Sequence, residues 1–432
     1  MRSRNADGES RLSCWLRVRE FAVPPSMIES ATARRADGDW AGACAAARVD
    51  VDLNLRSLAR TRGAELAARI RADLRNLAPD LLRWHLPRIA PDGLLRPGLT
   101  ISLARYGGDL HLVARTPPAW ADAGQRFSLA LWDRAEAGAA HPDRRFRLDL
   151  HRHLWDARRA ADLRVRSGVE SRDPPAAVPR GCAVDRWAAE AAILLRAEGR
   201  TDGSVSVRFG GRRRLILEAT GAGMLRVAPG AVRGWAAALP VLPDAATWVL
   251  PDLALLRAGL IDPGRLHPLV AAALAPDQHP GRAPAPGPAA GPRLVECRGA
   301  RHRIGLVHGV LVPLDHGPEE LRREELLAAL SGTPLACLRA IDEAHREPAE
   351  LADVRARLDH GDAAGALAVV EALLGPDALL RGGGLHEELQ TAALRRITYG
   401  LFRAGLAGRG PLPTTHDQRR SHRGHPRHAG TR

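Results

Sequence analysis

LTISLARYGGDLHLVART, residues 99–116, shows that this chain contains β-structure. Apolar and polar residues alternate on both sides of Gly107-Gly108-Asp109. A period of two is typical of strands with one buried face, and a short glycine turn between two such runs predicts a β-hairpin. RFSLALWD, residues 126–133, continues the pattern as a third strand. The segment therefore predicts a small antiparallel sheet.

Helical patterns surround this sheet. Residues 27–86 repeat apolar side chains every three to four residues, as do residues 183–198 and the stretch from Pro318 to about Leu406. Residues 204–221 predict a second hairpin, and residues 293–316 predict two or three further short strands. We therefore predict an α+β protein, with helical N- and C-terminal regions flanking small antiparallel β-sheets.

Changes in composition predict the domain organisation. The clearest linker is PDQHPGRAPAPGPAAGPR, residues 276–293, which is rich in proline, alanine and glycine. The segments that we predict are a flexible extension (1–26), a helical and β-hairpin domain (27–166), a domain of helix, hairpin and helices (182–275), the linker (276–293), a domain of short strands followed by helices (294–406), and a disordered basic tail (407–432).

The charge balance is strongly basic, with a net charge of +14 and a pI near 11.0. The 63 basic residues are all arginine, which is partly the residue usage of a high-GC coding sequence. Residues 406–432 hold six arginines and one aspartate without any aromatic residue. One hypothesis is therefore a nucleic-acid-associated protein that contacts phosphates through its arginine-rich surface and tail, without base stacking.

The absence of lysine excludes several classes of enzyme. Phosphate-loop nucleotidases, protein kinases, pyridoxal-phosphate enzymes and Schiff-base aldolases each need a lysine amine. IDEAH, residues 341–345, resembles the DEAH box of superfamily 2 helicases. However, apolar residues at 335, 338 and 341 predict a helix there, with Asp342, Glu343 and His345 on a solvated face. We find no motif for a cofactor.

Cysteine usage and hydropathy favour a cytoplasmic protein. The five cysteines are widely spaced and form no CxxC pair, which is typical of reduced, buried thiols. No signal peptide is recognisable, and no apolar run is long enough to span a bilayer, so we expect no membrane association.

LDLHRHLWD, residues 148–156, is the first candidate site. Asp149, His151, His153 and Trp155 resemble the first-strand signature of metal-dependent hydrolases of the amidohydrolase superfamily, over about nine residues. That resemblance implies His151 and His153 as metal ligands of a hydrolase. The alternative is an amphipathic helix whose core side carries Leu150, Leu154, Ala157 and Ala161. We favour the helix, because the strands and helices of a barrel do not follow.

Cys297, His302, His308 and His316 form a second cluster in the sequence. Their spacing fits no zinc template, and strand register is expected to scatter them over both faces of a sheet. The sequence therefore predicts no metal site and no catalytic residue.

One internal similarity points to binding. RRADGDWAGACAAA (34–47) and RLDHGDAAGALAVV (357–370) share seven of fourteen residues. Glycine ending one helix and aspartate capping the next predict two helical hairpins, each of which resembles the turn of tetratricopeptide-type repeats. We expect a non-enzymatic cytoplasmic binding protein that uses these hairpins to hold a protein partner, whose identity the sequence does not name.

Overall fold

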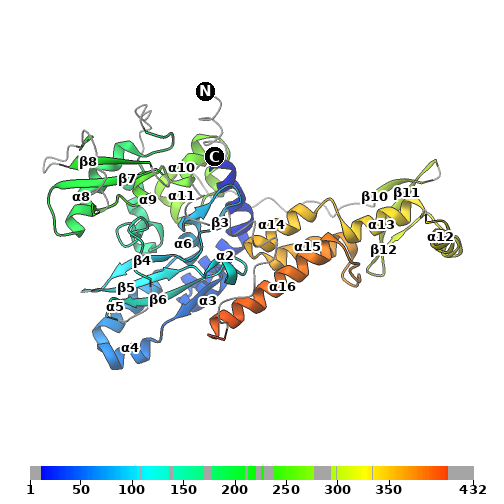
Figure 1. The fold of residues 1–432 in the computed structure, drawn as a ribbon, viewed down its shortest axis with the longest axis horizontal. Coiled ribbons are helices and arrows are strands. Elements are labelled where there is room, and N and C mark those ends of the chain that lie inside the picture. The colour runs from blue at the N-terminus through cyan, green and yellow to red at the C-terminus, as the bar shows by residue number, and fades with distance from the viewer. Residues whose placement is uncertain are drawn as a thin grey trace. The chain divides into compact units, whose positions relative to one another are not determined.

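The computed structural model describes most of the chain in two compact units (Figure 1). Unit 1 comprises Met1–Ala283 with Pro411–Arg432, and unit 2 comprises Pro284–Gly410. The division falls inside the proline-rich stretch expected to be a linker, most of which lies outside the described residues. The basic tail, residues 407–432, also lies outside the described residues. The described residues are 11–107, 109–135, 140–168, 178–209, 213–219, 225–227, 238–276, 293–297, 299–332 and 334–406.

The first part of unit 1 is a mixed sheet with helices before it. Its strand order is β1-β6-β5-β4, and the predicted hairpin is present as β4 paired antiparallel with β5. Strand β1 runs parallel to β6, with Val49 opposite Phe127. The elements are α2 (Pro25–Ala36), α3 (Trp40–Ala46), β1 (Val49–Asp52), α4 (Leu55–Arg62), α5 (Ala64–Arg75), α6 (Pro79–His85), the short pair β2 (Arg88–Ile89) and β3 (Leu94–Leu95), β4 (Thr100–Arg105), β5 (Leu110–Arg115) and β6 (Phe127–Asp133).

Residues 27–86 were expected to form helices only. The structure corrects this, because Val49–Asp52 form strand β1. The sequence VDVD is too short to show a period, and its partner strand lies far along the chain. The sheet is therefore not purely antiparallel.

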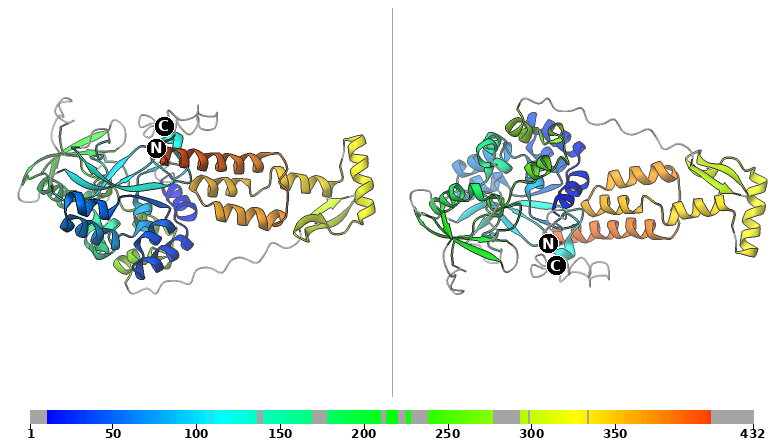
Figure 2. Two further views of the ribbon diagram at one scale, coloured as in Figure 1. Left: turned by 90° about the horizontal axis from the view of Figure 1, so that it is seen from below. Right: turned by 90° about the horizontal axis from the view of Figure 1, so that it is seen from above.

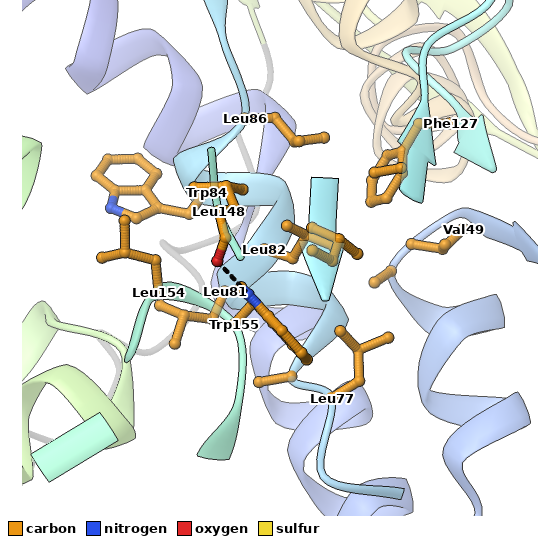
Figure 3. Packing of buried hydrophobic residues seen from close by; sticks show 14 of the residues in the cluster. Val49, Leu77, Leu81, Leu82, Trp84, Leu86, Phe127, Leu148, Leu154 and Trp155 are labelled. Atoms are coloured by element: carbon orange, nitrogen blue, oxygen red, sulfur yellow. Dashed lines mark hydrogen bonds between the residues drawn. The ribbon is translucent and has the colours of Figure 1, made fainter. Parts of the chain in front are cut away.

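Trp155 lies at the centre of the main hydrophobic core of unit 1 (Figure 3). Its ring is fully buried, and its Nε1 donates a hydrogen bond to the carbonyl oxygen of Leu148 at 3.0 Å. The ring lies beside leucines of α6, and Phe127 at the start of β6 belongs to the same cluster. Burial of this many large side chains supplies the main stabilising free energy of the unit.

Residues 11–26 also belong to this core, which differs from the flexible extension expected for residues 1–26. Cys14, Val18 and Phe21 are buried, and Val18–Ala22 forms one π-helical turn. The guanidinium of Arg11 lies 4.5 Å from the ring centre of Trp248, which is a cation–π contact. The start of the described chain is therefore anchored beside residues more than two hundred positions away.

The segment after Asp149 corrects the predicted amphipathic helix. It forms 3-10 turns at Arg152–Leu154 and Ala157–Asp162, followed by one α-helical turn, α7 (Leu163–Arg166). Besides the local bonds of its turns, the segment makes two backbone bonds to the loop between α5 and α6: Ala78 N–H donates to Trp155 O, and Ala157 N–H donates to Asn76 O, each at 2.8 Å. The segment is therefore tied to a distant part of the chain and does not continue as one helix.

The second part of unit 1 packs α8 on a hairpin sheet. Trp187, Leu194 and Leu195 of α8 are buried against β7 and β8, as the amphipathic pattern predicts. Among the helices expected in this domain, the last is preceded by a 3-10 turn at Pro263–Arg265, and its α-helix begins at Pro268. The elements are α8 (Trp187–Ala197), β7 (Gly203–Arg208), β8 (Arg214–Ala219), β9 (Leu225–Val227), α9 (Asp244–Thr247), α10 (Pro251–Arg257) and α11 (Pro268–Leu274).

Unit 2 joins a three-stranded antiparallel sheet to a run of helices, as the sequence predicts. The strand order is β10-β11-β12. Both views of Figure 2 show α14, α15 and α16, in orange to red, lying alongside one another, with buried leucines between them. The elements are β10 (Arg293–Cys297), β11 (Ala300–Val307), β12 (Val310–Pro313), α12 (Pro318–Ser331), α13 (Ala336–Arg346), α14 (Leu351–His360), α15 (Ala363–Leu374) and α16 (Gly384–Arg403).

Candidate functional site

His151 and His153 lie in the 3-10 turn that follows the sheet of unit 1, and both side chains are about 1% exposed. Their ring centres are 5.7 Å apart with the planes inclined at 61°. Nδ1 of His151 lies 3.0 Å from the carbonyl oxygen of Arg147. The two imidazoles therefore do meet, as the HxH pattern suggests, but inside the protein.

Glu190 of α8 faces His151. Its Oε2 lies 3.1 Å from Nε2 of His151, and Arg166 donates two hydrogen bonds to the same carboxylate, at 3.0 and 2.5 Å. Burial alone would raise the pKa of Glu190, but His151 and Arg166 outweigh burial and lower it to about 2. Glu190 is consequently an anion held by two cation-capable groups.

Arg166 also lies beside His153, with Nη1 3.4 Å from Nδ1 of that ring, and donates to Leu150 O at 2.6 Å. Burial, His151 and Arg166 together lower the pKa of His153 well below its usual value, so the ring is neutral at neutral pH. A guanidinium this close repels a divalent cation. The arrangement favours a structural ion-pair network over a hydrolytic metal centre.

Asp156 extends the buried polar network on the side of α5. Arg152 and Arg158 each bind both Asp156 and Asp73. Burial would raise the pKa of Asp156, but hydrogen bonds from Arg158 and Arg152 lower it instead. Tyr106 donates to Asp73 at 2.7 Å. Residues 148–156 are thus connected through ion pairs to Asp73 of α5 and to Glu190 of α8.

Two helical turns have the same construction in α2–α3 and α14–α15. Asp39 accepts the N–H of Gly42 at 2.8 Å, and Asp362 accepts the N–H of Gly365 at 3.1 Å. The glycines that end α2 and α14, at positions 38 and 361, have φ angles of 77° and 83°. The turn chemistry predicted from the sequence is confirmed. The hairpin of unit 1 packs into the core, where Met27 and Cys44 are buried.

Cys337 completes a cluster that spacing alone could not reveal. Ligand atoms of Cys297, His316 and Cys337 all lie within 4.8 Å of one another, and all three residues are buried. The ring of His302 stacks on that of His316 with centres 4.3 Å apart. The expected scatter over two faces is therefore wrong for these residues, whereas His308 lies in the exposed turn after β11.

Register explains why Cys297 and His302 share a face. His302 of β11 is directly opposite Val295 of β10, and Cys297 lies two residues further along the same strand. Side chains at i and i+2, and directly opposite pairs, point to one side of a sheet. Cys337, near the start of α13, packs on that side. The missing signal was this cysteine, which lies in a different element.

The IDEAH segment is helical, as predicted, and belongs to α13. Asp342 is bound by Arg346 at 2.8 Å and by Arg381 at 2.7 Å. His345 is buried rather than on the solvated face, and burial lowers its pKa. These contacts are those of a structural helix.

Comparisons with known protein families, with functionally described proteins and with solved structures found no match to this chain. Over the part of the chain that the structure describes, no helix combines the length and apolar composition needed to cross a membrane. The class that the fold defines is α+β, with a buried ion-pair network in one unit and a thiol–imidazole cluster in the other.

Proposed function

We propose that this protein is a non-enzymatic, cytoplasmic binding protein whose unit 2 holds the surface for a partner protein. One observation carries the proposal. Of the seventeen large hydrophobic side chains that are exposed among the described residues, fourteen belong to unit 2, although unit 1 is the larger unit. Concentrated apolar exposure of this kind is typical of interaction surfaces.

Helix α12 is the most exposed of these elements. None of its residues is buried, and Leu326, Leu327 and Leu330 are 63%, 53% and 87% exposed. Its half-buried residues are Glu320, Leu321, Glu324 and Ala328, and the last three, spaced by three and four positions, mark the opposite, inward side. An isolated helix of this length is only marginally stable in water, so burial of its leucines against a partner would stabilise it.

Helix α16 shows the same pattern. Leu394, Ile397 and Leu401 recur at three and four positions and are 57%, 61% and 44% exposed. Leu385 and Tyr399, on the other side of the helix, are buried, and Leu385 belongs to the apolar cluster that includes residues of α14 and α15. Each of the two helices therefore has one side that packs against the protein. The exposed apolar residues lie on the other side and are not needed for that packing.

The partner that fits α12 is a protein with a basic amphipathic helix. Stripes at helical spacing bind helices through interlocking apolar residues. The residues of α12 include four glutamates and two arginines, a local net charge of −2 within a chain of +14. Attraction to a basic helix would orient it beside the leucines.

Site-specific photo-cross-linking tests the proposal. A photoreactive residue replaces Leu327 or Leu330 in the full chain, and Val165, an 84% exposed residue of unit 1, is replaced as the matched control. We expect one partner protein to be cross-linked from the α12 positions and not from position 165. The purified partner should then bind the Leu326→Glu, Leu330→Glu variant at least about tenfold more weakly than wild type, because a charge enters the apolar contact.

Three outcomes would overturn this assignment. Cross-links from α12 and from position 165 to the same proteins would show that the surface is not selective. Cross-links only between copies of this chain would identify a second copy as the occupant. A purified partner that binds wild type and variant equally would place its site elsewhere.

A further inference from the structure

We propose that Cys297, His302, His316 and Cys337 bind one Zn²⁺ in a tetrahedral structural centre that ties the sheet β10–β12 to α13. The proposal does not depend on the proposed binding function. It concerns residues from four separate places: the end of β10, the middle of β11, the segment after β12, and the start of α13.

The geometry of three ligands is already close to that of a zinc site. A tetrahedron with Zn–S near 2.3 Å and Zn–N near 2.0–2.1 Å has ligand atoms about 3.3–3.8 Å apart. The ligand atoms of Cys297, His316 and Cys337 lie within 4.8 Å of one another. A contraction of about 1 Å or less would bring all three into coordination distance of one ion.

Unpartnered nitrogen atoms point to a missing ligand. Both ring nitrogens of His316 and Nδ1 of His302 are buried and have no hydrogen-bond partner among the described residues. Leaving such atoms unsatisfied destabilises the folded state, and coordination to a metal removes that cost. His302 stacks on His316 but is not among the three residues whose ligand atoms lie within 4.8 Å of one another, so its ring must turn towards the ion to supply the fourth ligand.

Glu320 gives the cluster the outer contact that metal-bound histidines usually have. Its Oε2 lies 3.3 Å from Nδ1 of His316. A carboxylate on one imidazole nitrogen orients the ring and leaves the other nitrogen for the metal. We therefore assign Nε2 of His316 as the ligand atom.

The sheet has little other support. Among all the residues of β10, β11 and β12, only Cys297, Ile304 and Pro313 are buried. A small element that buries so little apolar surface is usually stabilised by disulfides or by a metal. The cysteines of the described chain are free thiols, which leaves the metal as the brace.

The ligand chemistry selects zinc. Two thiolates and two imidazoles in tetrahedral array are a standard structural zinc set. Zinc binds the thiolate form of cysteine and the neutral form of histidine, so protons compete with the metal and the affinity for zinc should fall as the pH falls.

The first test is zinc content. Tag-free full-length protein is dialysed against a weak chelator and analysed by plasma mass spectrometry. We expect about one zinc per chain, lost in Cys297→Ser and in Cys337→Ser. Cys44→Ser is the matched control, because Cys44 is a buried free thiol of unit 1, and this variant should keep the zinc. Comparing variants also removes any contribution from histidines of the tail.

The second test does not require a destabilised variant. Wild-type protein reconstituted with Co²⁺ should show thiolate-to-cobalt charge transfer in the near ultraviolet and the intense visible bands of a tetrahedral site. His316→Cys should keep the metal and increase the charge-transfer intensity by about half, because three thiolates replace two. His302→Ala should weaken zinc binding at least about tenfold in a chelator competition.

Several results would overturn the inference. If the Cys337→Ser variant keeps its zinc, the metal is bound at another place in the chain. Protein that contains no zinc and whose non-reduced peptide map joins Cys297 to Cys337 carries a disulfide at this place. An unchanged affinity in His302→Ala would remove His302 from the ligand set.

Discussion

Nε2 of His151 and Oε2 of Glu190 lie 3.1 Å apart in the interior of unit 1, where both side chains are nearly inaccessible to solvent. The pair joins the turn after the first sheet to α8 of the second part of the unit. Arg166 binds the same carboxylate. These three side chains connect the two parts of unit 1. Glu190, which contacts both of the others, is therefore the first target for mutation.

Glu190→Gln should lower the free energy of unfolding by about 3 kcal/mol, because the half-buried Arg166 guanidinium loses the buried carboxylate that is its counter-charge. The measurement is urea unfolding followed by circular dichroism. Asp109→Asn is the matched control, since Asp109 is exposed and pairs with Arg134 at 3.6 Å. The control should change stability by less than about 1 kcal/mol. Equal effects of the two substitutions would contradict a buried, energetically important pair.

The same residue predicts a pH dependence. The folded pKa of Glu190 is about 2, below the ordinary value of 4.5. A lowered folded pKa means that the stabilisation is complete above pH 4.5 and is lost as the pH falls from there towards 2. Melting temperature should therefore fall less steeply over this interval in Glu190→Gln than in wild type. Parallel curves for the two proteins would show that Glu190 does not titrate in this way.

Gly365→Ala should destabilise unit 2 by about 1 kcal/mol through loss of the Asp362 cap. An added Cβ would lie 2.1 Å from Oδ2 of Asp362, so the capping carboxylate must move. Gly400→Ala in α16 is the control, because nothing lies within 4 Å of its added Cβ. That change should raise stability by up to about 1 kcal/mol, as helix propensity predicts. Thermal unfolding of both variants shows whether each change raises or lowers the stability. Two changes in the same direction would argue against a stabilising role of the Asp362 cap.

Any affinity of this chain for nucleic acid should depend on the tail beyond Leu406. Deleting residues 407–432 removes a net charge of +5. Each lost phosphate contact reduces the slope of log affinity against log salt by about 0.9. Fluorescence anisotropy with a random DNA duplex at several salt concentrations measures this slope. If the slope of log affinity against log salt is unchanged by the deletion, the phosphate contacts are made by arginines of the folded units.

Local patterns predicted the elements that make their bonds locally. The hairpins β4–β5 and β7–β8 and helix α8 follow from period and turn residues alone. Strand β1 did not, since four residues carry no period and the strand exists because β6 lies beside it. The turns after His151 are bonded to the backbone of Asn76 and Ala78, which lie far away in the sequence.

The candidate sites show the same division. Spacing identified His151 and His153 as a pair, and the structure brings them together, but only the fold places Glu190 and Arg166 against them. The histidines of unit 2 were visible in the sequence, whereas Cys337 comes from an element that no short motif connects to them. Contacts between distant residues are fixed by packing, which one sequence does not display.

The contact between Arg11 and Trp248 has a consequence for how the chain is made. Synthesis proceeds from the N-terminus at roughly 5–20 residues per second, so Trp248 follows Arg11 by roughly 12 to 48 s. Throughout that interval Cys14, Val18 and Phe21, which are buried in the finished unit, lack part of their surroundings. The nascent chain therefore carries this apolar segment without its final surroundings until Trp248 has been made. A chaperone that holds the segment during that interval should raise the yield of folded protein.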